Sequence, residues 1–182
     1  MGKTYDEIND DLAEFMRAQH VFFAASAPLS ADGLVNVSPK GLDSFRILGP
    51  RKVAYLDLAG SGIETLAHAQ ENGRITLMFC AFEGRPLIVR LYGRATAHQE
   101  GSPGFAELLP SFAERPAMRS IIEVEVTRIA DSCGWGVPRM SFEADRDQHP
   151  KFAETIGPER VIEMKKQANS KSLDGLPGLT FD

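Results

Sequence analysis

The chain has 182 residues, a formal net charge of −5 and a hydrophobic fraction of 43%. This length suits one domain, and the composition is ordinary for a globular protein. The acidic balance argues against nucleic-acid binding, which usually needs a clustered basic face, and no apolar run approaches a membrane helix. With no signal-peptide core after the N-terminus, we expect one cytoplasmic domain over residues 1–182, without nucleic-acid or membrane partners.

The cysteines and histidines fit that expectation. Cys80 lies in an apolar run and Cys133 in a glycine-rich stretch, so we expect two reduced thiols, with a disulfide between them as the alternative. The four histidines are spread along the chain without the short spacing of zinc ligands. We therefore predict no metal site.

The first half of the chain predicts one helix followed by two strand pairs. Residues 1–20 contain an amphipathic helix, because Thr4 and Glu7 have capping-box spacing and apolar residues follow at helical intervals. Residues 21–27 and 34–38 form a predicted hairpin around Asp32-Gly33. Residues 45–48 and 52–58 flank a Gly49-Pro50 turn, which indicates a second strand pair.

The second half alternates long strands with helices. A short helix over 63–72 is stopped by Gly73, and strands at 74–82 and 86–97 meet at Glu83-Gly84. A short helix over 105–112 precedes an alternating strand at 119–129. Residues 149–182 give a C-terminal helix, broken at Gly157-Pro158, and a tail. Strands joined by short turns predict a mainly β fold with flanking helices (α+β), in which about six antiparallel strands close into a barrel.

One turn has the chemistry of an anion site. Ser61 lies between two glycines before the predicted helix, and Glu64 completes a capping box. The first turn of a helix offers free N–H groups and a positive dipole end to an anion. Thr65 adds a hydroxyl, while Lys40 and Ser38 at a strand end offer a cation and a further donor. The alternative is an ordinary capped turn with a solvated lysine.

Two further residues have open interpretations. Arg90 and Arg94 share a strand face, where they serve either an anion or a solvated edge. Trp135 stands between Gly134 and Gly136, so it either packs on a flat ligand or plugs a loop.

An ordered series of segments carries a family resemblance. It runs through Asn36-Val37-Ser38-Pro39-Lys40-Gly41, Tyr55-Leu56-Asp57, the glycine–serine turn, Asn72-Gly73-Arg74 and Arg90-Leu91-Tyr92-Gly93-Arg94-Ala95. This series resembles the pyridoxamine 5'-phosphate oxidase-like family, and residues 132–138 and 169–179 resemble an uncharacterised branch of it. The resemblance implies a six-stranded split β-barrel that forms a homodimer, with FMN in a groove between the two barrels. The implied cofactor-binding residues are Asn36, Ser38, Lys40, Tyr55, Asp57, Ser61, Thr65, Arg90 and Trp135.

The chain also departs from that family. Relatives place an Arg-Lys pair at the helix start, where this chain has Ile63-Glu64-Thr65. The C-terminal stretch through which pyridoxamine phosphate oxidases hold their substrate has no counterpart, so that activity is not carried over. We predict an FMN-dependent oxidoreductase with an unknown substrate and unknown catalytic residues. The alternatives are a reductase that uses the deazaflavin F420, and a non-catalytic module that binds flavin or haem.

Overall fold

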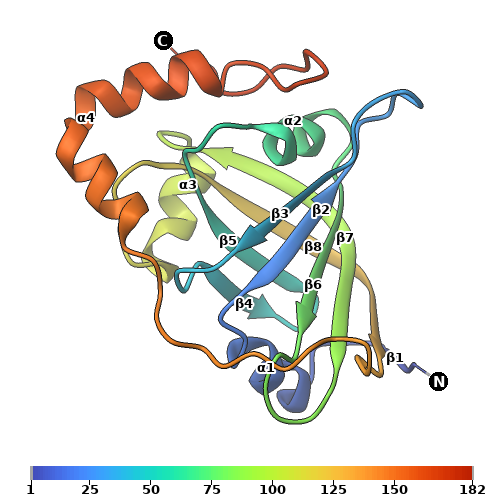
Figure 1. Ribbon diagram of the computed structural model, residues 1–182. Helices are drawn as coiled ribbons and strands as arrows, with labels where there is room; N and C mark the ends of the chain where they lie inside the picture. The colour runs from blue at the N-terminus through green and yellow to red at the C-terminus, as the bar shows by residue number, and fades with distance from the viewer. Residues whose placement is uncertain (1, 182) are drawn as a thin grey trace.

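Eight antiparallel strands form the framework of the computed structural model, which describes residues 2–181 (Figure 1). Met1 and Asp182, the ends of the predicted domain, lie outside the described residues. The strands are β1 (Thr4–Tyr5), β2 (Phe22–Ser26), β3 (Asn36–Lys40), β4 (Phe45–Gly49), β5 (Lys52–Leu58), β6 (Arg74–Cys80), β7 (Ile88–Gln99) and β8 (Met118–Ser132). The helices are α1 (Asp10–Arg17), α2 (Glu64–Glu71), α3 (Pro103–Leu108) and α4 (Gln148–Ala168).

The strands follow the order β3-β2-β6-β7-β8-β5-β4, with β1 added to β8. The strands β3 and β4 are the two ends of this path, so the barrel is split between them. The predicted antiparallel split barrel of the α+β class is therefore confirmed. The predicted count of six strands was too low. One of the additional strands is the two-residue β1, which pairs with Ile129 and Ala130 of β8.

The predicted capping box at the N-terminus is wrong. Thr4 belongs to β1, and α1 begins at Asp10, where the side chain of Asn9 accepts a hydrogen bond from the Leu12 amide. The carboxylate of Asp131 explains the difference, because it accepts hydrogen bonds from the Lys3 amide and the Tyr5 hydroxyl. These bonds hold the first residues extended against β8, and sequence spacing alone does not reveal so distant a partner.

The apolar interior of the barrel contains a cluster of aromatic rings. Phe22, Phe45, Tyr55 and Phe79 pack against one another with ring centroids 4.8–5.5 Å apart. The helix α1 covers one end of the barrel and α2 covers the other (Figure 1). Among the described residues, no helix is both long and apolar enough to cross a membrane.

The C-terminal region wraps around the outside of the barrel. Residues 133–147, here called the strap, run across the α1 end without regular structure and lead to α4 (Figure 1). Gly157 has a φ of 77°, which bends α4 at the predicted break. The arm of α4 beyond this kink and the tail after it lie over the end of the barrel that α2 covers.

Candidate functional site

A buried charge cluster joins three strands near the α2 end of the barrel. Asp57 of β5 is fully buried, and its two carboxylate oxygens lie 2.7 Å from Lys40 Nζ and 2.7 Å from Arg119 Nε. Burial alone raises the pKa of Asp57, but the adjacent ammonium and guanidinium outweigh it and hold that pKa at about 2. The carboxylate therefore stays ionised, and the cluster of two cations and one anion carries a net positive charge.

The alternation of β3 turns its predicted site residues inward. Asn36, Ser38 and Lys40 lie opposite Ser26, Ala24 and Phe22 of β2, all three of which are buried. Side chains on one face of a strand repeat every two residues, so these β3 side chains share the inner face. Lys40 remains 18% exposed, which places its ammonium at the boundary between the interior and the split.

The start of α2 meets β3 directly. The side-chain amide of Asn36 donates from Nδ2 to Thr65 Oγ1 at 3.0 Å, and the hydroxyl of Ser38 donates to Asn36 Oδ1 at 3.3 Å. Thr65 lies in the first turn of α2, whose N-cap residue, Ile63, makes no side-chain capping bond. The structure therefore brings a strand end and an uncapped helix start together.

The predicted capping box of Ser61 and Glu64 is wrong. The carboxylate of Glu64 accepts a hydrogen bond from the amide of Leu173 in the C-terminal tail, a partner 109 residues away. Ser61 is exposed and lines a hollow of about 270 Å³ beneath α4, beside His149 and Phe152. Ser61 thus lies in surroundings different from those of Lys40.

The Tyr55 hydroxyl is an unpaired polar group inside the barrel. Its side chain is fully buried, and the hydroxyl has no hydrogen-bond partner among the described residues. Burial and the negative charge of Asp57 raise the pKa of Tyr55 well above its usual value. The phenol is therefore protonated and can donate a hydrogen bond.

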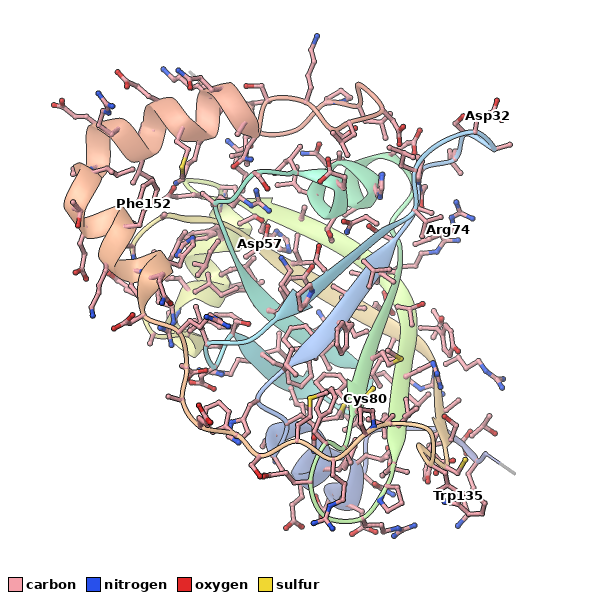
Figure 2. All side chains as sticks on the ribbon, viewed as in Figure 1. Asp32, Asp57, Arg74, Cys80, Trp135 and Phe152 are labelled. Carbon is pink, nitrogen blue, oxygen red and sulfur yellow. The ribbon has the colours of Figure 1, made fainter. Side chains whose placement is uncertain are left out.

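Two predicted residues lie away from this cluster. Arg90 stands opposite Met78 and Ala130 on the outer face of the sheet, where its guanidinium donates to Ser132 Oγ. Trp135 is 82% exposed and lies at the opposite end of the molecule from Asp57 (Figure 2). A single chain does not bring either residue to the charge cluster.

Three side chains that sequence reasoning missed fix the loop between β5 and α2. Arg119 Nη1 donates to the Gly62 carbonyl at 2.6 Å, and His149 Nε2 donates to the Ala59 carbonyl at 2.8 Å. The side-chain amide of the buried Asn169 donates from Nδ2 to the Gly60 carbonyl at 2.9 Å. Arg119 carried a usable signal, a charged residue at the start of a buried strand, whereas no local pattern marked the other two.

Comparisons with known proteins identify the family and the fold. The family model described as pyridoxamine 5'-phosphate oxidase matches residues 8–133. This chain belongs to the pyridoxamine 5'-phosphate oxidase family. A family member from Aspergillus flavus is 38% identical over 192 aligned residues, which cover 96% of this chain and 77% of that protein.

Solved structures share the fold. A variant of HupZ from Group A Streptococcus superposes with a TM-score of 0.53 at 20% identity, over 69% of this chain and 99% of that one. A Lactobacillus delbrueckii protein assigned as a pyridoxamine 5'-phosphate oxidase gives a TM-score of 0.53 at 18% identity, over 70% of this chain and 98% of that one. The family match ends at residue 133, the first residue of the strap, so the rest of the strap, α4 and the tail lie beyond it.

Proposed function

We propose that this protein is an FMN-binding oxidoreductase in which the flavin phosphate lies between β3 and the start of α2. Family membership supports a flavin-type barrel. The observation that carries the proposal is the pair of contacts Asn36–Thr65 and Lys40–Asp57, which join the first residue of β3 to the uncapped start of α2 and its last residue to β5.

The residues present there fit a phosphate. One N–H of the Lys40 ammonium points to Asp57, which leaves two others to donate elsewhere. The hydroxyls of Ser38 and Thr65 and the first-turn amides of α2 add neutral donors, and the helix dipole favours an anion. Glu64 is held by the Leu173 amide, so its carboxylate has a partner within the chain. The unpaired Tyr55 hydroxyl is a further buried donor beside this cluster.

The chemistry divides between cofactor and chain. Flavin, when bound, supplies a ring that accepts and returns electron pairs. Asp57 holds the Lys40 and Arg119 side chains in position, and Arg119 in turn donates to the Gly62 carbonyl at the entry to α2. We assign no acid or base role to any side chain among residues 2–181, and pyridoxamine phosphate oxidation is not part of the proposal.

We further propose that two chains associate through the outer face of the sheet. Val37, Ala25, Thr76 and Tyr92 stand in register across β3, β2, β6 and β7. Val37 is 60% exposed and Tyr92 37% exposed, and the residues between them, Ala25 and Thr76, are small, so a second chain can cover this row. Arg90 lies on this same face, so in a dimer it can approach the second barrel. Trp135 lies far from the charge cluster of its own chain, so in this dimer only the Trp135 of the second chain can reach the flavin bound beside that cluster.

Purification tests the proposal. We expect yellow protein with a flavin absorption spectrum, and mass analysis of the small molecule released by gentle denaturation should identify FMN. Anaerobic bleaching by NADH or NADPH would support turnover, and sedimentation should give a dimer. F420 or haem in place of FMN, or failure of the apoprotein to take up any flavin, would contradict it. A cytoplasmic location stays part of the proposal.

A further inference from the structure

A two-lobed hollow lies at the α1 end of the barrel, away from the surroundings of Ser61. The first lobe, about 370 Å³, lies between the end of α1 and residues 41–47. The second lobe, about 440 Å³, lies between the end of α1, the β6–β7 turn and the strap. Both lobes are lined by Gln19 and His20, so they adjoin. Together they are large enough for a small organic molecule.

The first lobe contains an unsatisfied hydroxyl. Ser44 is only 6% exposed, and its Oγ has no hydrogen-bond partner among residues 2–181. Burying a hydroxyl without a partner is unfavourable, and most buried polar side chains are paired. Ser44 lines the first lobe, so a molecule bound there can supply the missing partner.

The turn that positions Ser44 is strained. Leu42 and Asp43 have φ values of 58° and 52°, and the Ser44 amide donates to the Gly41 carbonyl at 3.2 Å. Such turns with two left-handed central residues prefer Asn-Gly, and a leucine in this conformation is unfavourable. Backbone strain of this kind clusters at functional sites. The strained turn follows Lys40 directly in the chain, which links the hollow to the proposed flavin strand.

The second lobe is lined mainly by apolar and aromatic side chains. Phe82 and Met140 contribute to its wall, and the Met140 amide donates to the Phe82 carbonyl at 3.0 Å. The rings of His20 and Phe142 stack with centroids 3.6 Å apart and planes 8° apart. This stacked pair stands where the strap meets α1. The wall of the second lobe therefore already accommodates stacked aromatic rings.

We propose that the two lobes bind a planar aromatic molecule that carries one hydrogen-bonding oxygen. The ring lies against His20 and Phe142, and the oxygen bonds to Ser44 Oγ. The stacked pair and the strap form one side of the site. As a substrate site this rests on the proposed flavin function, but as a binding site it depends on α1, residues 41–47 and the strap alone.

Three probes of similar size test the proposal by calorimetry on the purified protein. We expect 2-naphthol to bind once per chain. The analogue 2-methylnaphthalene lacks the hydroxyl and should bind roughly three- to tenfold more weakly, the range of one neutral hydrogen bond. Decahydro-2-naphthol keeps the hydroxyl but not the flat ring, and it should also bind more weakly. Absence of 2-naphthol binding, or equal affinity for all three probes, would overturn the proposal.

Variants assign the contacts. Ser44→Ala should remove the preference for 2-naphthol over 2-methylnaphthalene without lowering the melting temperature, because the hydroxyl has no partner in the free protein. Phe142→Ala should weaken both aromatic probes. Phe152→Ala is the matched control, since Phe152 is 53% exposed on α4 and lies outside both lobes. A preference that survives Ser44→Ala would overturn the assignment, whatever the flavin content of the protein.

Discussion

The interactions that hold the barrel together differ from those that attach the C-terminal region to it. Residues 8–133, the part matched by the family model, form a paired sheet around a continuous apolar core. Residues 134–182 attach to it through a small separate apolar cluster, in which Leu179 packs with Ile63 and Leu66, and through hydrogen bonds to backbone carbonyls. The side chains of His149, Lys165 and Asn169 donate such bonds. The barrel therefore provides a fixed scaffold, whereas the C-terminal region contacts that scaffold at a small number of places.

Two of these contacts hold the loop between β5 and α2, which leads into the proposed cofactor site. His149 and Asn169 bind consecutive carbonyls of the loop from outside, while Arg119 binds it from the barrel. The charge cluster thus belongs to the scaffold. The two bonds from His149 and Asn169, here called the clamp, belong to the C-terminal region. Variants in the two regions should differ in how strongly they affect stability.

The largest expected effect is in the scaffold. Asp57→Asn leaves the Lys40 and Arg119 charges close together without their shared carboxylate, so we expect a loss of about 3–5 kcal/mol in the free energy of unfolding. Urea denaturation measures this. Asp174→Asn is the control, because the exposed Asp174 of the tail accepts one bond from the Leu34 amide. If the two variants lower the free energy of unfolding equally, the charge cluster does not stabilise the barrel as we describe.

A smaller effect is expected in the clamp. Asn169→Ala removes the bond to the Gly60 carbonyl and should lower the free energy of unfolding by about 1–3 kcal/mol. It should also weaken flavin retention, because the loop it holds leads into α2. The exposed neighbour Gln167 provides the control variant Gln167→Ala. Full flavin retention in Asn169→Ala would separate the clamp from the cofactor site.

The pH dependence tests another scaffold residue. His68 is fully buried, its Nδ1 lies 2.9 Å from Ser26 Oγ, and burial lowers its pKa. The unfolded chain binds a proton here more readily than the folded chain, so stability should fall as the pH drops below about 6.5, the ordinary histidine value. His68→Gln should flatten this part of the curve. An unchanged slope in that variant would assign the effect to other groups.

The smallest expected effect is a gain. Leu42→Asn places a residue that tolerates the left-handed region at a φ of 58°, so we expect about 0.5–1 kcal/mol of added stability. Thermal unfolding measures it. The same change at Leu29, an exposed residue outside that region, should give no gain. A loss of stability in Leu42→Asn would show that the packing contacts of the leucine side chain outweigh the strain in its backbone.

Local patterns predicted the elements whose partners lie nearby in the sequence. The hairpin of β2 and β3, the pairs β4–β5 and β6–β7, and the break in α4 all follow from turn residues and alternation. The two predicted capping boxes failed because Asp131 and Leu173, each more than a hundred residues away in the chain, supply the competing contacts.

The candidate site was predictable to a similar extent. Lys40 and Thr65 could be named from the sequence, since strand ends and helix starts are visible locally, whereas Asn36 was named through the family resemblance. The pairing of Lys40 with Asp57 and Arg119, and the loop contacts of His149 and Asn169, depend on how distant segments pack. The same holds for the strained turn at Leu42 and Asp43, whose residue types do not suggest a left-handed conformation.

The most direct test of the phosphate assignment compares FMN with riboflavin, which lacks the phosphate, in the apoprotein and in Lys40→Ala. We expect the apoprotein to prefer FMN strongly. Lys40→Ala should weaken FMN binding by roughly 10- to 150-fold, the range of a charge-assisted hydrogen bond, and leave riboflavin affinity unchanged. Equal affinity for the two flavins in the apoprotein, or an equal loss for both in Lys40→Ala, would contradict the account.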